Sequence, residues 1–174
     1  MMLVLQVITV FLVSVAMALS LAHALEFPGK IRLHKEQYIA TQSIYYPGFT
    51  IGGGIGEGLG LLATFILLVL TPRNFPAFWW TLIAFIALAI MHLVFWIITQ
   101  PVNRHWLAGL PLSHSASIFF AIGDIAVRGA DQTDRSDQWK HWRDRWEYSH
   151  IIRAVLAGIS LISLTVAVAT YSGS

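Results

Sequence analysis

The sequence contains no cysteine and little charge. Without cysteine the chain forms no disulfide, no Cys-ligated zinc or iron–sulfur site and no thiol nucleophile. Only 11% of the 174 residues are charged, against about 25% in a typical soluble domain. The chain also lacks a lysine- and arginine-rich block and any nucleic-acid recognition motif, so we expect no nucleic-acid partner. The composition argues against a water-soluble globular protein. It favours a protein whose partner is the lipid bilayer.

The few charged residues are clustered, and they leave four long apolar stretches between them. Apolar runs of about 18 residues or more are long enough to cross a bilayer. We therefore predict one domain, residues 1–174, with an all-α fold: an integral membrane four-helix bundle with one long loop. The spans are expected at residues 3–25, 49–70, 76–100 and 147–171. The first resembles a signal peptide at Ala22-His23-Ala24, but it lacks a positively charged start and its apolar run is too long, so we interpret it as a helix.

The connections between the spans define two sides of the membrane. Residues 26–46 and 103–148 lie on one side, and both termini and the turn at 71–75 lie on the other. Of the 11 Lys and Arg residues, nine lie on the first side. The positive-inside rule then predicts a multi-pass protein of the bacterial cytoplasmic membrane with both termini outside. Within the long loop, residues 116–127 are apolar but too short to span, which predicts an interfacial or re-entrant helix.

The second predicted span begins with a glycine-rich run, residues 51–60. No strand precedes it and no Lys-Ser/Thr pair follows it, which disfavours a phosphate-binding loop. Its glycines recur every four residues on two faces, Gly52, Gly56 and Gly60 on one and Gly54 and Gly58 on the other. Small residues at this spacing let membrane helices pack closely. We expect both faces to bring neighbouring backbones close to Glu57.

Ionisable residues in or beside the spans are expected at one depth, and an ionisable group inside a membrane is a functional hypothesis by default. At about 1.5 Å rise per residue they fall within roughly 10 Å of the same interface. Glu147 and His150 lie three residues apart on one helix face, as in carboxylate-bridged metal sites of helix bundles. A ligand set without sulfur suits iron, manganese, zinc or copper. The candidate metal ligands are His23, Glu26, Glu57, His92, Glu147 and His150.

Ordinary ion pairs explain the same residues equally simply, because structural pairs also create polar clusters. Glu57 with Arg153 and Glu147 with Arg143 are the expected pairs, and His23 and Glu26 would then lie among the lipid headgroups. His92 fits this interpretation least well, because its neighbours are apolar and its helix is uncharged. A single hydrogen bond to Ser or Thr would nevertheless satisfy it. The two interpretations stay open.

Short motifs spread over most of the chain resemble the anthrone-oxygenase-like family of four-helix membrane proteins. They follow the third span and lead into the fourth: Pro101-Val-Asn103-Arg104, Trp139-x-x-Trp142 and Trp146-Glu147-x-x-His150-x-x-Arg153. The stretch from His23-Ala-Leu-Glu26-x-Pro28 to Tyr46-x-Gly48-Phe49 is similar to a subset of that family. Most members of the family are uncharacterised. Some resemble enzymes that add oxygen to an anthrone, without an obvious cofactor.

The resemblance implies roles for individual residues. Glu147 or His150 would be the catalytic base that removes an acidic C–H proton. Arg153 and Asn103 would stabilise the resulting oxyanion. An apolar aromatic pocket for a hydrophobic small-molecule substrate would be walled by tryptophans, namely Trp96, Trp142 and Trp146.

Two other classes of function compete with an oxygenase. One is a redox subunit that binds a transition metal or haem through His92 with His23 or His150. The other is a non-enzymatic subunit that packs against a larger membrane complex through its glycine-rich helix. The oxygenase interpretation implies no cofactor. The redox-subunit interpretation implies a transition metal or a haem.

Overall fold

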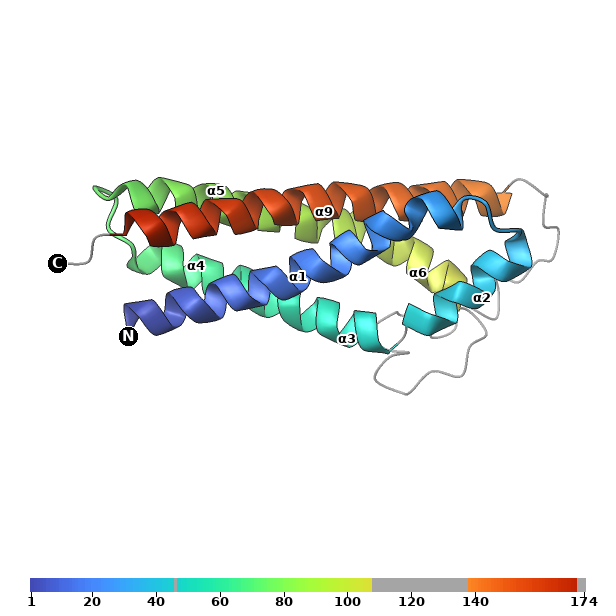
Figure 1. Ribbon diagram of the computed structural model, residues 1–174, viewed down its shortest axis with the longest axis horizontal. Helices are drawn as coiled ribbons and strands as arrows, with labels where there is room; N and C mark the ends of the chain where they lie inside the picture. The colour runs from blue at the N-terminus through green and yellow to red at the C-terminus, as the bar shows by residue number, and fades with distance from the viewer. Residues whose placement is uncertain (46, 108–137, 172–174) are drawn as a thin grey trace.

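The computed structural model describes residues 1–45, 47–107 and 138–171, and every element in these ranges is helical (Figure 1). The elements are α1 (Met2–Lys30), α2 (Lys35–Tyr45), α3 (Gly48–Gly54), η1 (Ile55–Leu59), α4 (Gly60–Leu70), α5 (Pro76–Val94), η2 (Phe95–Thr99), α6 (Gln100–Leu107) and α9 (Gln138–Thr170). The prediction of an all-α bundle is confirmed. The predicted interfacial helix at 116–127 lies outside the described residues.

Four helices are long and apolar enough to cross a membrane: Met2–Lys30, Gly48–Leu70, Pro76–Asn103 and Gln138–Thr170. They correspond to the four predicted spans and fit a multi-pass integral membrane protein. The first helix runs five residues past the predicted end at Leu25, and the last begins at Gln138 rather than at 147. Charged residues at a helix end mark where the chain leaves the apolar phase, and they do not stop the helix itself.

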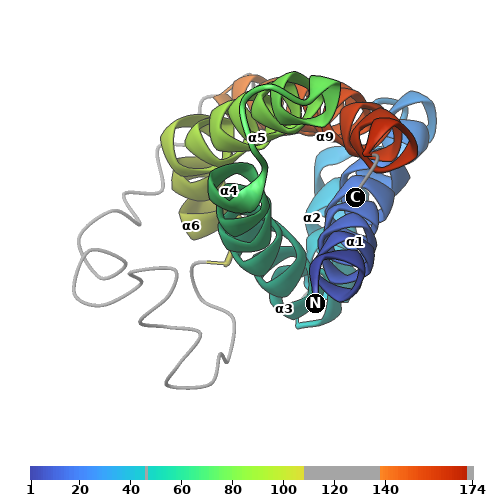
Figure 2. The same cartoon turned by 90° about the vertical axis from the view of Figure 1, so that its left-hand side faces the viewer.

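The bundle is formed by α1, α4, α5 and α9, with α9 packed against both α5 and α1, and α4 packed against α1 and α5 (Figure 2). The start of α1, the end of α9 and the turn between α4 and α5 lie at one end (Figure 1). At that turn, Pro76 is the first residue of α5 and Phe75 before it is extended, as expected for a proline that opens a helix. The other end holds α2 and α6.

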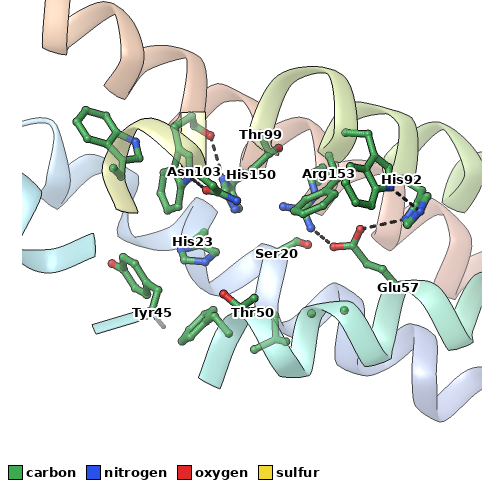
Figure 3. A pocket seen from close by; sticks show the side chains of 18 of the residues that line it. Ser20, His23, Tyr45, Thr50, Glu57, His92, Thr99, Asn103, His150 and Arg153 are labelled. Atoms are coloured by element: carbon green, nitrogen blue, oxygen red, sulfur yellow. Dashed lines mark hydrogen bonds and ion pairs between the residues drawn. The ribbon is translucent and has the colours of Figure 1, made fainter. Parts of the chain in front are cut away.

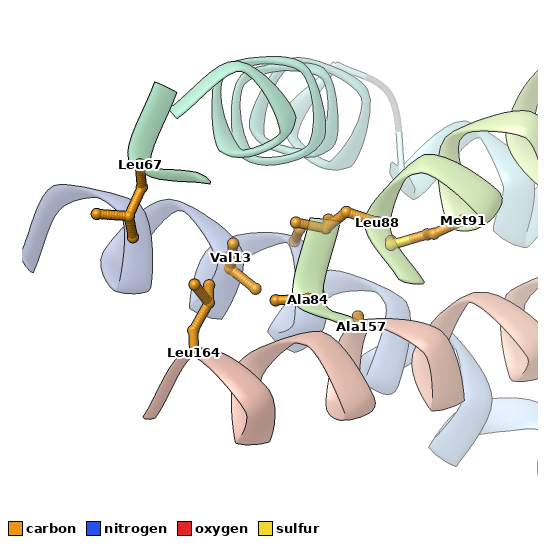
Figure 4. Close-up of a cluster of buried hydrophobic side chains, with 8 residues drawn as sticks. Val13, Leu67, Ala84, Leu88, Met91, Ala157 and Leu164 are labelled. Atoms are coloured by element: carbon orange, nitrogen blue, oxygen red, sulfur yellow. The ribbon is translucent and has the colours of Figure 1, made fainter. Parts of the chain in front are cut away.

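The apolar core consists of side chains from all four spanning helices, and many of them are small (Figure 4). Its buried members are Val13, Ala16, Leu67, Ala84, Leu88, Met91, Ala157 and Leu164. α1 contributes two of them, so it is an integral part of the bundle. Alanines in this core let the helix backbones approach each other, which is how membrane helices gain packing energy.

The glycine-rich run packs on one face only. A Cβ at Gly56 would lie 2.9 Å from the backbone nitrogen of Ala16, and one at Gly52 would lie 3.1 Å from Leu19 Cδ1. This face therefore packs against α1, as predicted. Among the described residues the prediction for the second face is wrong, because a Cβ at Gly54 or Gly58 would meet none of their atoms within 4 Å.

A short helix, α2, lies in the connection between the first two spans, for which no secondary structure was predicted from the sequence, and covers the end of the bundle opposite the termini. Tyr38 of α2 is fully buried in a second, largely aromatic cluster. The cluster consists of Tyr38, Val102, Trp106, Trp139 and Trp146, with Leu33, Tyr45 and Trp142 packed around it. Through this cluster, α2 packs against α6 and against the first turns of α9.

Candidate functional site

A pocket of about 170 Å³ lies between α2 and the spanning helices (Figure 3). All four spanning helices and α2 contribute to its lining. Of the residues singled out from the sequence, those that line it are His23, Glu57, His92, Trp96, Asn103, Trp146, His150 and Arg153. The expectation that polar residues from four helices meet in one layer is therefore largely confirmed.

Two histidines meet at the centre of the pocket. The rings of His23 and His150 are 4.3 Å apart at their centroids and meet edge to face. His150 Nδ1 lies 2.9 Å from the carbonyl oxygen of Trp146, and because a carbonyl only accepts, Nδ1 carries the proton. In the neutral ring, Nε2 of His150 then keeps its lone pair. His150 is thus prepared to accept a proton or a hydrogen bond in the pocket.

His23 has the opposite arrangement. Its Nδ1 lies 3.5 Å from the Lys30 ammonium, which only donates, so the proton of the neutral ring belongs on Nε2. The ring packs against Phe49, Tyr45 and Trp146. His23 is 5% exposed, so the idea that it lies among headgroups is wrong. The two histidines therefore offer the pocket one donor and one acceptor.

A second polar group lies deeper in the bundle. Arg153 donates to the Glu57 carboxylate, which confirms the predicted ion pair, and both side chains are buried. The other carboxylate oxygen of Glu57 lies 3.9 Å from His92 Nδ1. His92 Nε2 accepts a hydrogen bond from the indole nitrogen of Trp96 at 2.9 Å. The partner of His92 is thus a tryptophan, where the sequence suggested Ser or Thr, and the group links three spanning helices.

Two of the three helices that carry this deeper group contain a π-helical turn at the pocket. η1 includes Glu57 and η2 includes Trp96. π-Helical turns are rare and frequently occur at functional sites. Two contacts with α9 support η2: Thr99 Oγ1 bonds Ser149 Oγ at 2.9 Å, and Arg145 donates to the carbonyl of Ile97 at 3.0 Å. Apolar periodicity does not distinguish an α-turn from a π-turn, so neither was predictable.

Glu147 does not line the pocket. Its carboxylate is 0% exposed, accepts a hydrogen bond from Tyr38 at 2.9 Å and lies 3.7 Å from Lys30. The predicted pair with Arg143 is wrong, because Arg143 pairs with Asp144 at 2.7 Å. The reason is that α1 extends to Lys30, which places that ammonium between Glu147 and Glu26, 2.8 Å from the latter.

Lys30 and two tyrosines of α2 complete the network around Glu147. The ammonium lies over the rings of Tyr45 and Trp146, at 4.6 and 4.8 Å. Tyr45 donates to Glu26 at 2.7 Å. Burial, followed by the charge of Glu147, raises the pKa of Tyr38, and burial with the Glu26 hydrogen bond raises the pKa of Tyr45. Both phenols therefore stay protonated and keep donating to these carboxylates.

Aromatic side chains form much of the remaining wall. Trp96 and Trp146 line the pocket as predicted, together with Phe49, Phe95 and Trp106. Trp142 does not, and instead packs against the cluster around Tyr38. Asn103 lines the pocket, but its Oδ1 accepts from the indole nitrogen of Trp146 at 2.8 Å. Trp106 was missed because it lies past the predicted end of the third span.

The six candidate metal ligands do not converge on one point. Among the described residues, no three His, Asp or Glu side chains form a group that could hold a metal ion. Glu57 and His92 belong to the deeper group, whereas Glu26 and Glu147 contact Lys30. An ammonium beside a carboxylate competes with a cation for the same oxygens, so this network favours the ion-pair interpretation.

Three of the lining side chains keep a buried nitrogen that donates no hydrogen bond to the described residues. They are Gln42, at Nε2, Arg153, at Nε, and His92, at Nδ1. His92 Nδ1 lies 3.9 Å from Glu57. A buried polar group without a partner costs about 1–3 kcal/mol. All three are donors, so a ligand that brings oxygen acceptors satisfies them.

No protein-family model, curated protein or solved structure matches this chain. Proposals about its function therefore rest on the geometry of the pocket and on the resemblance of its sequence motifs.

Proposed function

We propose that the protein is a membrane-embedded oxygenase that binds a flat aromatic molecule carrying carbonyl or phenolate oxygens, with an anthrone as the representative substrate. The observation that carries the proposal is His150, which lines an aromatic-walled pocket with Nδ1 held by the Trp146 carbonyl. This hydrogen bond leaves Nε2 as a base. Arg153, a cation in the same pocket, supplies the charge that a developing oxyanion needs.

The proposed reaction begins when His150 Nε2 removes the acidic methylene proton of the anthrone. The electron pair delocalises onto the carbonyl oxygen, giving an anthracenolate anion that Arg153 stabilises. This carbanion equivalent reacts with O₂, forms a C–O bond and becomes a hydroperoxide after protonation. Loss of water from the hydroperoxide breaks the O–O bond and gives the anthraquinone. Anthrone and O₂ are thus converted to anthraquinone and one water, with the substrate carbon oxidised and O₂ reduced.

Of the two bases that the resemblance left open, the geometry supports His150. Glu147 is enclosed by Tyr38 and Lys30 and does not line the pocket, so it is not placed to meet a substrate. We assign Glu147 a positioning role, in which it holds Lys30 and α2 in place beside the pocket. The Nδ2 group of Asn103, the donor that an oxyanion would need, lies 3.5 Å from its acceptor Gln100 Oε1, and we therefore assign Arg153 as the main oxyanion partner.

The size of the pocket sets a limit on what it encloses. A cavity of about 150 Å³ holds one benzene, and this pocket measures about 170 Å³. The pocket therefore encloses about one ring of a polycyclic ligand, and the rest of the ligand extends through an opening. The charge bias of the loops supports the proposal that this pocket lies near the cytoplasmic face.

The test is turnover of anthrone by purified protein in liposomes, followed as O₂ uptake. We expect His150→Gln to lower kcat by at least about 10²-fold, the usual contribution of general base catalysis. Glu147→Gln keeps an acceptor for Tyr38 and is expected to stay within a few-fold of the parent protein. The matched control is His141→Gln, on the same helix but exposed. Equal activity of His150→Gln and His141→Gln would overturn the assignment of the base.

A further inference from the structure

The opening of the pocket is marked by the exposure of the residues that line it. Most are buried or half-buried, and the two that are exposed are Gly54 and Trp96. Trp96 is 44% exposed. Gly54 ends α3 and Trp96 belongs to η2, so the two come from different spanning helices. The mouth of the pocket therefore lies between the second and third spans.

The absence of side chains keeps the α3 side of this mouth open. Gly53 and Gly54 both line the pocket, and a Cβ at either would meet no atom of the described part of the chain within 4 Å. The neighbouring Gly52 and Gly56 differ, because a Cβ there would contact α1. Close helix packing therefore explains the glycines that face α1, and it does not explain Gly53 and Gly54.

The surroundings of the mouth are apolar and lie at bilayer depth. Ile51 and Ile55 on one side, and Leu93 and Ile97 on the other, are each about half exposed or more. Gly54 lies six residues inside its candidate span and Trp96 seven residues inside its own, or about 9–10 Å at the rise of an α-helix. Side chains of this kind at this depth face lipid.

The interior of the pocket, by contrast, is polar. Gln42 and Arg153 are 5% and 6% exposed, and each has a donor nitrogen without a partner among the described residues. A ligand that satisfies these donors presents oxygen acceptors inwards. Its apolar remainder then occupies the mouth between Gly54 and Trp96.

We infer that the pocket opens sideways into the bilayer between Gly54 and Trp96 and takes its ligand, an apolar ring system with oxygen acceptors at one edge, directly from the lipid phase. The lateral opening rests on the geometry, and the ligand class rests on the proposed function. Trp96 forms the η2 side of this mouth. His92 positions it, through the hydrogen bond from the indole nitrogen to Nε2.

Spin labelling tests the opening without any substrate, and the absence of cysteine makes every introduced thiol unique. The labelled variants are Gly54→Cys, Ile162→Cys as a lipid reference, because Ile162 is 66% exposed within the last span, and Asn74→Cys as a water reference in the turn. In liposomes, collision of each label with O₂, which concentrates in lipid, is compared with collision with a water-soluble nickel chelate.

We expect the label at position 54 to behave like the one at 162, with frequent O₂ collisions and few nickel collisions. Nickel collisions as frequent as at position 74 would mean that the mouth opens to water. Rare collisions with both reagents would mean that another part of the chain covers the mouth. Either of these two results would overturn the inference.

A pair of glycine variants tests the ligand. Leucine at Gly54 fills the mouth, whereas leucine at Gly58, equally open and on the same helix but outside the pocket lining, does not. With anthraquinone in the bilayer as the probe, saturable quenching of tryptophan fluorescence reports binding. We expect Gly54→Leu to weaken binding about tenfold or more, the effect of about 1.4 kcal/mol of steric cost, and Gly58→Leu to leave it unchanged.

Equal binding by the two leucine variants would overturn the inferred route of the ligand. If the parent protein does not bind anthraquinone but the label at position 54 reports lipid, the ligand class fails and the lateral opening stands. The two experiments therefore separate failure of the opening from failure of the proposed function.

Discussion

Glu57 and Arg153 form a buried ion pair in the lining of the pocket. Each side chain is 6% exposed, and the two residues come from different spanning helices. Removing one partner of a buried pair leaves the other charge unpaired, which costs about 3–5 kcal/mol. Removing both avoids that cost. The pair therefore contributes to stability mainly because each charge offsets the cost of burying the other.

We predict that Glu57→Gln and Arg153→Met each lower the free energy of unfolding by about 3–5 kcal/mol. The double variant is expected to lose less than the sum of the two, because neither charge then remains buried alone. Reversible unfolding in mixed detergent micelles measures the four proteins of this cycle. Strictly additive losses would show that the two side chains do not interact.

The sequence predicts this pair because an unpaired charge inside a membrane is costly. Two such charges at similar depth in separate helices are therefore expected to form an ion pair. Lys30 was missed, because the first span was ended where charge begins, at Glu26, whereas the helix continues to Lys30. That difference of one turn changed the partner of Glu147 from Arg143 to Lys30. Side-chain pairing depends on such small extensions, and hydropathy does not determine them.

The two helical faces of the glycine-rich run have different roles. Gly56 packs against the backbone of α1, and Gly58 lies in open space. We predict that Gly56→Ala lowers the free energy of unfolding by about 1–3 kcal/mol, because the new Cβ overpacks a backbone contact. Gly58→Ala is expected to be neutral or to stabilise the protein by up to about 1 kcal/mol through helix propensity. Thermal unfolding in detergent compares the two, and an equal loss in both would contradict the packing.

α2 is held by phenols that remain protonated. The pKa of Tyr38 and that of Tyr45 are raised above the ordinary value of about 10. A raised phenol pKa contributes stability that is complete below the unfolded pKa and is lost as the pH rises above it. We therefore predict that the melting temperature falls above about pH 10, and that Tyr38→Phe makes this fall shallower.

The control for this prediction is Tyr148→Phe, whose side chain is 56% exposed. Melting curves between neutral and strongly alkaline pH, with tyrosinate absorbance recorded in parallel, measure the effect. The same fall in the parent protein and in Tyr38→Phe would contradict the assignment to Tyr38.

The elements differ in how well sequence predicts them. Uncharged apolar runs located the four spans, because crossing a bilayer requires length and apolarity and little else. α2 was missed because it is polar and short, and its helical state depends on the buried contacts of Tyr38 and on the Glu26 bond of Tyr45. The π-turns at Glu57 and Trp96 were not predicted for a similar reason, because they depend on contacts made by other helices.

At the scale of the whole molecule, the helix arrangement places α2 and the pocket at one end and the α4–α5 turn at the other. The excess of Lys and Arg on the α2 side predicts that this end is cytoplasmic. We predict that a membrane-impermeant maleimide labels Asn74→Cys on intact spheroplasts and labels Ser43→Cys, in the exposed part of α2, only after permeabilisation. The opposite pattern would invert the topology.

The proposed function has His150, in a pocket between four membrane helices, drive oxygenation of an aromatic ketone. The most direct measurement is turnover of anthrone under ¹⁸O₂ by the protein in liposomes, before and after treatment with a metal chelator, with protein-free liposomes and His150→Gln as backgrounds. We expect anthraquinone with one ¹⁸O atom, formed well above both backgrounds and undiminished by the chelator. Product formation no faster than in the His150→Gln liposomes, or loss of activity with the metal, would contradict the proposed function.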